Sequence, residues 1–130
     1  MKRSILVLVA SLATFGLIVA GASAITRYDS QVNILGTSGS SSDLYVFGNV
    51  TSSKHKCVAN RRVNVYKVDS GPSGPVTTLV DTARTSDRGA WAAHGDFSGA
   101  VGAKATAVRK KFGRHHHKVC RFRSDSFPFF

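Results

Sequence analysis

Three consecutive histidines, His115-His116-His117, are the residues whose type and spacing come nearest to site chemistry in this sequence. If the surrounding segment is a strand, His115 and His117 project to the same side, where two imidazoles can hold a divalent metal ion. A third ligand would have to come from a neighbouring strand, and the sequence does not show one. Because Arg114 and Lys118 flank the histidines, the alternative is a solvated basic edge.

Positive charge near the C-terminal end of the chain is the second chemical feature. The cluster comprises Lys104, Arg109, Lys110, Lys111, Arg114, Lys118, Arg121 and Arg123. If the segments before and after residues 111–114 pair as a hairpin, these charges fall on one ribbon that can bind a polyanion by releasing its counterions. Phe112 at the tip would add a stacking contact. The alternative is edge protection, since positive charges on an exposed strand deter aggregation between sheets.

The rest of the inventory argues against catalysis. The acidic residues are seven Asp, with no Glu. The sequence has no Gly-x-Ser-x-Gly nucleophile elbow, no glycine loop for phosphate and no Cys–His pair with a free thiol. It therefore indicates a non-enzymatic protein without a cofactor. A small hydrolase is a third possibility, after a polyanion-binding module and a metal-binding protein. Sequence-specific recognition of nucleic acid is not expected.

The N-terminus has the pattern of a cleavable signal peptide. Lys2 and Arg3 precede an apolar run, and Ala22-Ser23-Ala24 supplies the small residues that signal peptidase needs. We expect cleavage after Ala24, which gives a secreted or cell-surface protein with no membrane span; the alternative is a retained anchor. Loss of Lys2 and Arg3 lowers the net charge from +11 to +9, which favours anionic partners.

The two cysteines of the chain are Cys57 and Cys120. In an exported chain the simplest interpretation is one disulfide between them. Two unpaired thiols are the alternative. A zinc site is disfavoured, because two distant cysteines lack the close spacing of structural zinc ligands.

Alternating apolar residues separated by turn signals predict strands and no helix. Residues 25–42 are rich in Ser and Gly and predict a flexible leader. The domain then spans residues 43–130, with strands expected near 44–50, 62–68, 76–82, 90–94, 101–109 and 115–124. The terminal Phe127-Pro128-Phe129-Phe130 forms either a last strand, an apolar cap on the core or a docking tail. The expected fold is all-β, an antiparallel Greek-key sandwich of about seven strands.

Three segments resemble the prealbumin-like (transthyretin-like) sandwich modules, also called carboxypeptidase regulatory-like domains. They are Gly48-x-Val50, Arg62-Val63-x-Val65-Tyr66 and the run from Thr85 through Gly89 to Trp91. The resemblance implies that the second segment is a core strand and that Trp91 fills the core. The positions of the cysteines are similar to those in small, secreted, basic bacterial proteins of unknown function. The hydrolase among these relatives ends in Tyr-Arg-Gly-Ser, which this chain lacks, so its activity is not carried over.

The sequence thus predicts a secreted binding or structural module that docks on an anionic surface polymer or polysaccharide through a basic hairpin. The alternative is a metal-binding accessory protein that uses His115 and His117.

Overall fold

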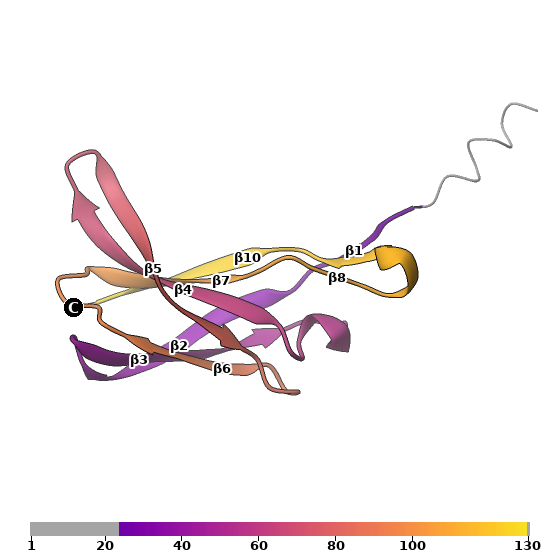
Figure 1. The fold of residues 1–130 in the computed structure, drawn as a ribbon, viewed down its shortest axis with the longest axis horizontal. Helices are drawn as coiled ribbons and strands as arrows, with labels where there is room; N and C mark the ends of the chain where they lie inside the picture. Colours follow the sequence, from indigo (N-terminus) through magenta and orange to yellow (C-terminus); the bar gives the residue numbers. More distant parts are fainter. Residues whose placement is uncertain (1–23, 130) are drawn as a thin grey trace, which may run out of the picture.

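The computed structural model describes residues 24–129, and these residues form an all-β fold, as the sequence predicts (Figure 1). Within this range no helix is long and apolar enough to span a membrane. The predicted signal peptide, residues 1–24, lies outside the described residues except for Ala24. The elements are β1 (Thr26–Tyr28), β2 (Gln31–Ser40), β3 (Asp43–Thr51), β4 (Arg62–Gly71), β5 (Gly74–Arg84), β6 (Ala90–Gly95), β7 (Gly102–Ala107), β8 (Lys110–Phe112), β9 (Lys118–Cys120) and β10 (Arg123–Pro128), with 3-10 turns η2 (His55–Cys57) and η3 (Arg114–His116).

The strands form three sheets, with the orders β2-β3-β6, β10-β7-β4-β5 and β1-β9-β8. Pairing is antiparallel throughout the described residues except between β1 and β9. Side chains from the first two sheets belong to a single hydrophobic cluster, so these sheets pack face to face. The described residues hold ten strands rather than about seven. The three strands that the sequence did not predict are β1, β2 and β8: β1 and β8 have only three residues, too short for alternation to reveal them, and β2 lies in the predicted leader.

Alternation along β3 and along the first four residues of β4 builds the core. Val46, Val50, Val63 and Val65 are completely buried and face one another across the two layers. Burial of each valine contributes about 1.5–3 kcal/mol relative to exposure. Trp91 on β6 is buried in the same cluster, as the sequence resemblance implied.

The indole of Trp91 lies against the backbone of Gly48, its register partner on β3. A Cβ atom on Gly48 would come within 1.8 Å of the carbonyl oxygen of Asn33 on β2. The position therefore has no room for a side chain, and glycine allows β2, β3 and Trp91 to approach closely.

Residues 31–40, predicted as part of a flexible leader, instead form β2. This strand pairs with β3 along its whole length, with a bulge between Ile34 and Gly36. Val32 and Ile34 are buried in the core, and the carboxylate of Asp125 accepts a hydrogen bond of 2.9 Å from the Ile34 amide. The Ser and Gly content that favoured disorder lies beyond the bulge. In that part of β2, exposed small residues pair with β3 through backbone hydrogen bonds, and this pairing does not depend on alternating apolar residues.

The predicted hairpin near the C-terminus is a long ribbon that bends where it leaves the four-stranded sheet. β7 pairs with β10 up to Ala107 and Arg123, and β8 then pairs with β9 from Lys110 and Cys120 onward. The reversal occupies residues 113–117 rather than 111–114. Beyond the bend β9 gains β1 as a parallel neighbour, which creates the small sheet at one end of the molecule.

The predicted disulfide between Cys57 and Cys120 is present, with 5.5 Å between the two Cα atoms. Both cysteines are fully buried. The bond joins η2, which follows β3, to β9, and so holds the small sheet against the end of the larger ones.

The C-terminal aromatic residues close the other end of the core. Phe127 belongs to β10, and both Phe127 and Phe129 are partly buried against the central cluster. The ring of Phe129 meets that of buried Phe97 edge-on, with 6.1 Å between centroids. Residues 127–129 therefore combine two of the expected arrangements, a last strand and an apolar cap, while Phe130 lies outside the described residues.

Candidate polyanion-binding surface

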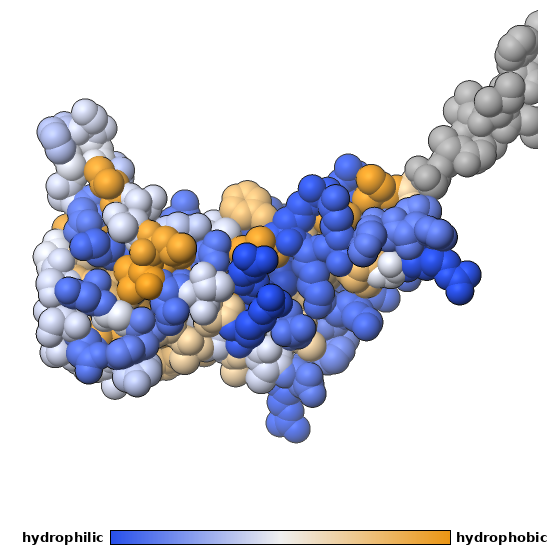
Figure 2. All heavy atoms as spheres, viewed as in Figure 1, coloured by the Kyte–Doolittle hydropathy of each residue, from blue (hydrophilic) through white to orange (hydrophobic). Residues whose placement is uncertain are grey.

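Unpaired positive charge is concentrated at the end of the molecule that carries the small sheet. Figure 2 shows strongly hydrophilic residues covering this end, at the right of the view. We define the basic end as Arg27, Lys54, Lys56, Arg62, Arg84, Arg109, Lys110, Lys111, Arg114 and Lys118. Within the described part of the chain, none of these residues takes part in an ion pair. The basic end is therefore a surface of uncompensated cations.

An open groove of about 430 Å³ on the basic end is lined by four arginines. The parallel pairing of β1 with β9 sets Arg27 beside Val119, and the link from β9 to β10 contributes Arg121 and Arg123. The remaining arginine is Arg109. Val119 and the exposed ring of Phe122 complete the lining. We call this the arginine groove. It offers charged donors around an apolar surface, a combination suited to a polymer that carries anionic groups on a carbon skeleton.

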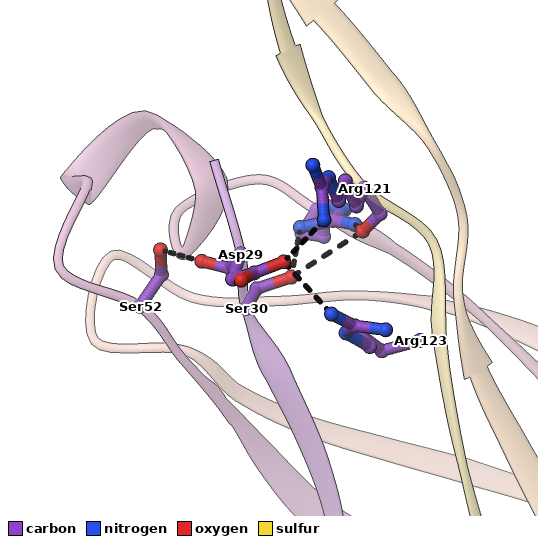
Figure 3. Close-up of polar contacts among 6 residues, drawn as sticks. Asp29, Ser30, Ser52, Arg121 and Arg123 are labelled. Atoms are coloured by element: carbon purple, nitrogen blue, oxygen red, sulfur yellow. Dashed lines mark hydrogen bonds and ion pairs between the residues drawn. The ribbon is translucent and has the colours of Figure 1, made fainter. Parts of the chain in front are cut away.

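Asp29 orients two of the arginines (Figure 3). Its carboxylate accepts hydrogen bonds from Arg123, at 2.8 Å, and from Arg121, at 3.4 Å. Its backbone carbonyl accepts a hydrogen bond of 2.6 Å from the hydroxyl of Ser52. Both arginine side chains stay about half exposed, so each exposed pair is worth at most about 1 kcal/mol and an incoming anion can compete with Asp29.

A second, polar groove of about 790 Å³ lies between the first residues of β2 and β10. Its lining includes the amides of Gln31 and Asn33, the hydroxyls of Ser52 and Ser124, and the carboxylates of Asp29 and Asp125. Arg123 lines both this groove and the arginine groove, so the two adjoin. Hydroxyl and amide groups of this kind can hydrogen-bond the uncharged parts of a polymer that the arginines anchor.

Buried Arg61 holds the backbone that supports both grooves. Its guanidinium donates to the carbonyls of Val108 at 2.7 Å, Cys57 at 2.9 Å and Arg121 at 2.6 Å, and to the hydroxyl of Ser30 at 3.1 Å. These acceptors come from four separate segments, which only the planar fork of arginine can satisfy together. Burial lowers the pKa of Arg61 to about 10, still well above neutral, so the group remains a cation.

Sequence reasoning overlooked Arg61, although one signal was present. The alternation that buries Val63 and Val65 continues backward to residue 61, which places Arg61 on the inward face just before β4. An arginine in phase with a buried strand face is unusual, because charged side chains are rarely buried without partners.

Lys110 lies at the centre of the cationic residues. Its ammonium donates to the carbonyls of Lys56 at 2.9 Å and Ala59 at 3.1 Å. Partial burial lowers the pKa of Lys110, and the neighbouring charges of Arg61, Lys56 and Arg84 lower it further. The positive groups thus act on one another without a carboxylate between them.

The histidines do not lie on a strand, so the strand predicted over residues 115–117 is wrong, and metal binding by His115 and His117 stays a prediction. His115 and His116 have φ of 58° and 56°, and they form η3 in the reversal between β8 and β9. A tight reversal of the chain needs residues in the left-handed conformation. Such residues interrupt the alternation of side chains that a strand would have. The rings of His115 and His117 are neighbours, with 5.8 Å between centroids. Within residues 24–129, no three metal-ligating side chains come together.

The predicted cationic cluster divides into three groups in the structure. Arg109, Lys110, Lys111, Arg114 and Lys118 belong to the basic end, and Arg121 and Arg123 line the arginine groove beside Asp29. Lys104 does not join them. It lies within β7 opposite Tyr66 and Ser126, six residues before Lys110, roughly 20 Å along an extended chain. The sequence did not reveal Arg27, Lys54, Lys56, Arg62 or Arg84, because the fold brings them in from other strands and loops.

Phe112, expected at the hairpin tip, lies on β8 beside Tyr28, with 5.9 Å between ring centroids. The ammonium of Lys54 lies 5.3 Å from the Tyr28 centroid and 6.0 Å from that of Phe112. A cation over two rings is held by their π faces and adds to the positive surface.

No family model matches the sequence, and no curated protein or solved structure matches the chain.

Proposed function

We propose that this protein is a secreted, non-enzymatic binding module that docks on an anionic surface polymer through the basic end and the arginine groove. The observation that carries the proposal is the gathering of ten cations without an ion pair in the described chain, beside a groove lined by four arginines. Holding such charges together is unfavourable in isolation, and a polyanion that releases its counterions on binding offsets the repulsion.

The disulfide and the strand order support an extracellular scaffold of the Greek-key, immunoglobulin-like type. The sheet β2-β3-β6 faces the sheet β10-β7-β4-β5, and the connection from β3 to β4 crosses from the first sheet to the second. This arrangement fits the expected sandwich of about seven strands, to which the small sheet is an addition. The prealbumin-like resemblance remains a proposal about ancestry.

Binding of the purified protein to heparin, polyphosphate and polygalacturonate at low salt and at 0.15 M salt tests the proposal. Lys111→Gln/Lys118→Gln removes two charges from β8 and β9 at the basic end. Lys67→Gln/Lys104→Gln removes two charges from β4 and β7 and is the matched control. We expect the first variant to bind about three- to tenfold more weakly at 0.15 M salt, and the control to bind like the wild type.

Equal weakening by both double variants would contradict docking through the basic end, because it would show that only net charge matters. Complete loss of wild-type binding to every polymer at 0.15 M salt would contradict the function itself, since surface charge alone is largely screened there.

A further inference from the structure

A small hollow of about 90 Å³ lies on the basic end, where β4 begins and β5 finishes. It is lined by Arg62, Arg84, Val108, Arg109 and Lys110. Four of the five lining residues are cationic, and no carboxylate lines the hollow. The hollow is much smaller than the grooves of about 430 and 790 Å³, which suits one small group rather than a length of polymer.

The strand register forces two of these cations together. Arg62 and Arg84 are direct partners across β4 and β5, an arrangement in which like charges destabilise a sheet. Within the described residues neither arginine forms an ion pair, and Arg84 has only a long hydrogen bond of 3.4 Å to the carbonyl of Asn60. An anion bound between the two guanidinium groups would offset this repulsion.

The link from β7 to β8 supplies the other two cations from a different direction. The Val108 amide donates to the carbonyl of Arg62 at 2.9 Å, which fixes the link against the start of β4. Lys110 follows, held by its hydrogen bonds to the carbonyls of Lys56 and Ala59. Partial burial and then the charges of Arg61, Lys56 and Arg84 lower the pKa of Lys110, in keeping with the four cations that line the hollow.

We propose that this hollow binds one tetrahedral oxyanion, a phosphate or sulfate ester carried by the polymer. The part of the proposal that concerns the polymer rests on the proposed function. Donors reach the hollow from two paired strands and from a separate link, so a ligand must accept hydrogen bonds in several directions. A phosphate or sulfate group does so, whereas a planar carboxylate accepts only in or near one plane. Arg109 lines both the hollow and the arginine groove, so an ester here can belong to a chain lying in that groove.

The first arm of the test is thermal unfolding of the purified protein in inorganic phosphate, sulfate, acetate or chloride at equal ionic strength. We expect phosphate or sulfate to raise the melting temperature, because a ligand that binds the folded state stabilises it. Arg62→Gln/Arg84→Gln should lose this shift, while Lys111→Gln/Lys118→Gln should keep it. Comparison of the two anions shows whether the site prefers phosphate or sulfate. An equal melting temperature in all four salts would overturn the proposal.

The second arm compares polyphosphate and dextran sulfate with polygalacturonate at equal charge and 0.15 M salt. We expect the wild type to prefer the ester polymers by about fivefold or more, and Arg62→Gln/Arg84→Gln to lose that preference while still binding at low salt. Arg84→Lys, which keeps the charge, should retain only part of it.

The outcomes separate the two proposals. Polymer binding without a preference for esters overturns the oxyanion site and leaves the proposed function standing. A melting shift that requires Arg62 and Arg84, without polymer binding at 0.15 M salt, supports the site and overturns the proposed function.

Discussion

Replacement of Arg61 by methionine is expected to destabilise the fold and to loosen the end of the molecule that carries the grooves. Methionine has a similar length and is apolar, so it fills most of the buried space but donates no hydrogen bond. The carbonyl of Cys57 would remain buried without its donor, and the partly buried carbonyls of Val108 and Arg121 would lose the guanidinium as donor. The change therefore differs from replacing a whole polar network, which can be neutral, because here the acceptors belong to the backbone and cannot be removed.

The expected loss of stability follows from the four hydrogen bonds that the Arg61 guanidinium donates. Each hydrogen bond from a charged group is worth about 1.5–3 kcal/mol, but bonds that share one donor group are not additive. Each acceptor left without its donor costs up to about 1–3 kcal/mol, and we expect Arg61→Met to lower the free energy of unfolding by about 3–5 kcal/mol in total. For a domain of this size the melting temperature falls by roughly 15–30 °C.

Urea unfolding of the wild type, Arg61→Met, Arg61→Lys and Arg62→Met measures the effect. Arg61→Lys keeps the charge, but one ammonium cannot reach four separate segments, so it should lose more than half as much stability as Arg61→Met. The next residue, Arg62, has an exposed side chain, and its replacement should change the free energy of unfolding by less than about 0.5 kcal/mol. If Arg61→Met unfolds within about 1 kcal/mol of the wild type, or Arg61→Lys behaves as the wild type, the assigned role of Arg61 is refuted.

Three further predictions concern stability. The disulfide closes a loop with a sequence separation of 63, so Cys57→Ala/Cys120→Ala should lower the free energy of unfolding by about 4 kcal/mol in the chain-entropy model, and equal urea midpoints would contradict this. Gly89 has φ of 90°, and a Cβ there would meet the Val50 carbonyl at 2.2 Å; Gly89→Ala should therefore cost at least about 1 kcal/mol by thermal melting, and an unchanged melting temperature would disprove it. Hydrogen bonds from the side chain and then the backbone of Ser98 lower the pKa of Asp96 below its ordinary 3.8. The stability that the Asp96 carboxylate gives the folded state is therefore present above pH 3.8 and is lost as the pH falls below 3.8. The difference in melting temperature between wild type and Asp96→Asn should shrink as the pH falls below about 4, and a constant difference would contradict the assignment.

The local pattern of the sequence determined most of the all-β fold. Alternation identified β3 and β4 with the correct inward faces, since burial of every second residue is a local property of an extended chain. Turn chemistry is equally local, since the glycine that ends the run Thr85 to Gly89 adopts a positive φ of 90°. The disulfide followed from counting, because two cysteines have only one way to pair.

Alternation failed where strands carry few apolar residues. The outer half of β2 consists of Ser, Gly and Thr and pairs through its backbone alone, so the sequence resembled a linker. The turn of η3 was misplaced for a similar reason. Histidine is not a strong turn former, and only the closure of β8 on β9 forces His115 and His116 into left-handed conformations.

The make-up of the candidate site was decided by tertiary structure. The sequence located one basic ribbon, but pairing and loop packing added Arg62, Arg84 and Lys54 from elsewhere and left Lys104 apart. Asp29 reaches Arg121 and Arg123 from more than ninety residues away, so no local pattern could show which cations are compensated. The charge of the protein is thus a property of its sequence, whereas the place where that charge stays unpaired depends on which strands meet.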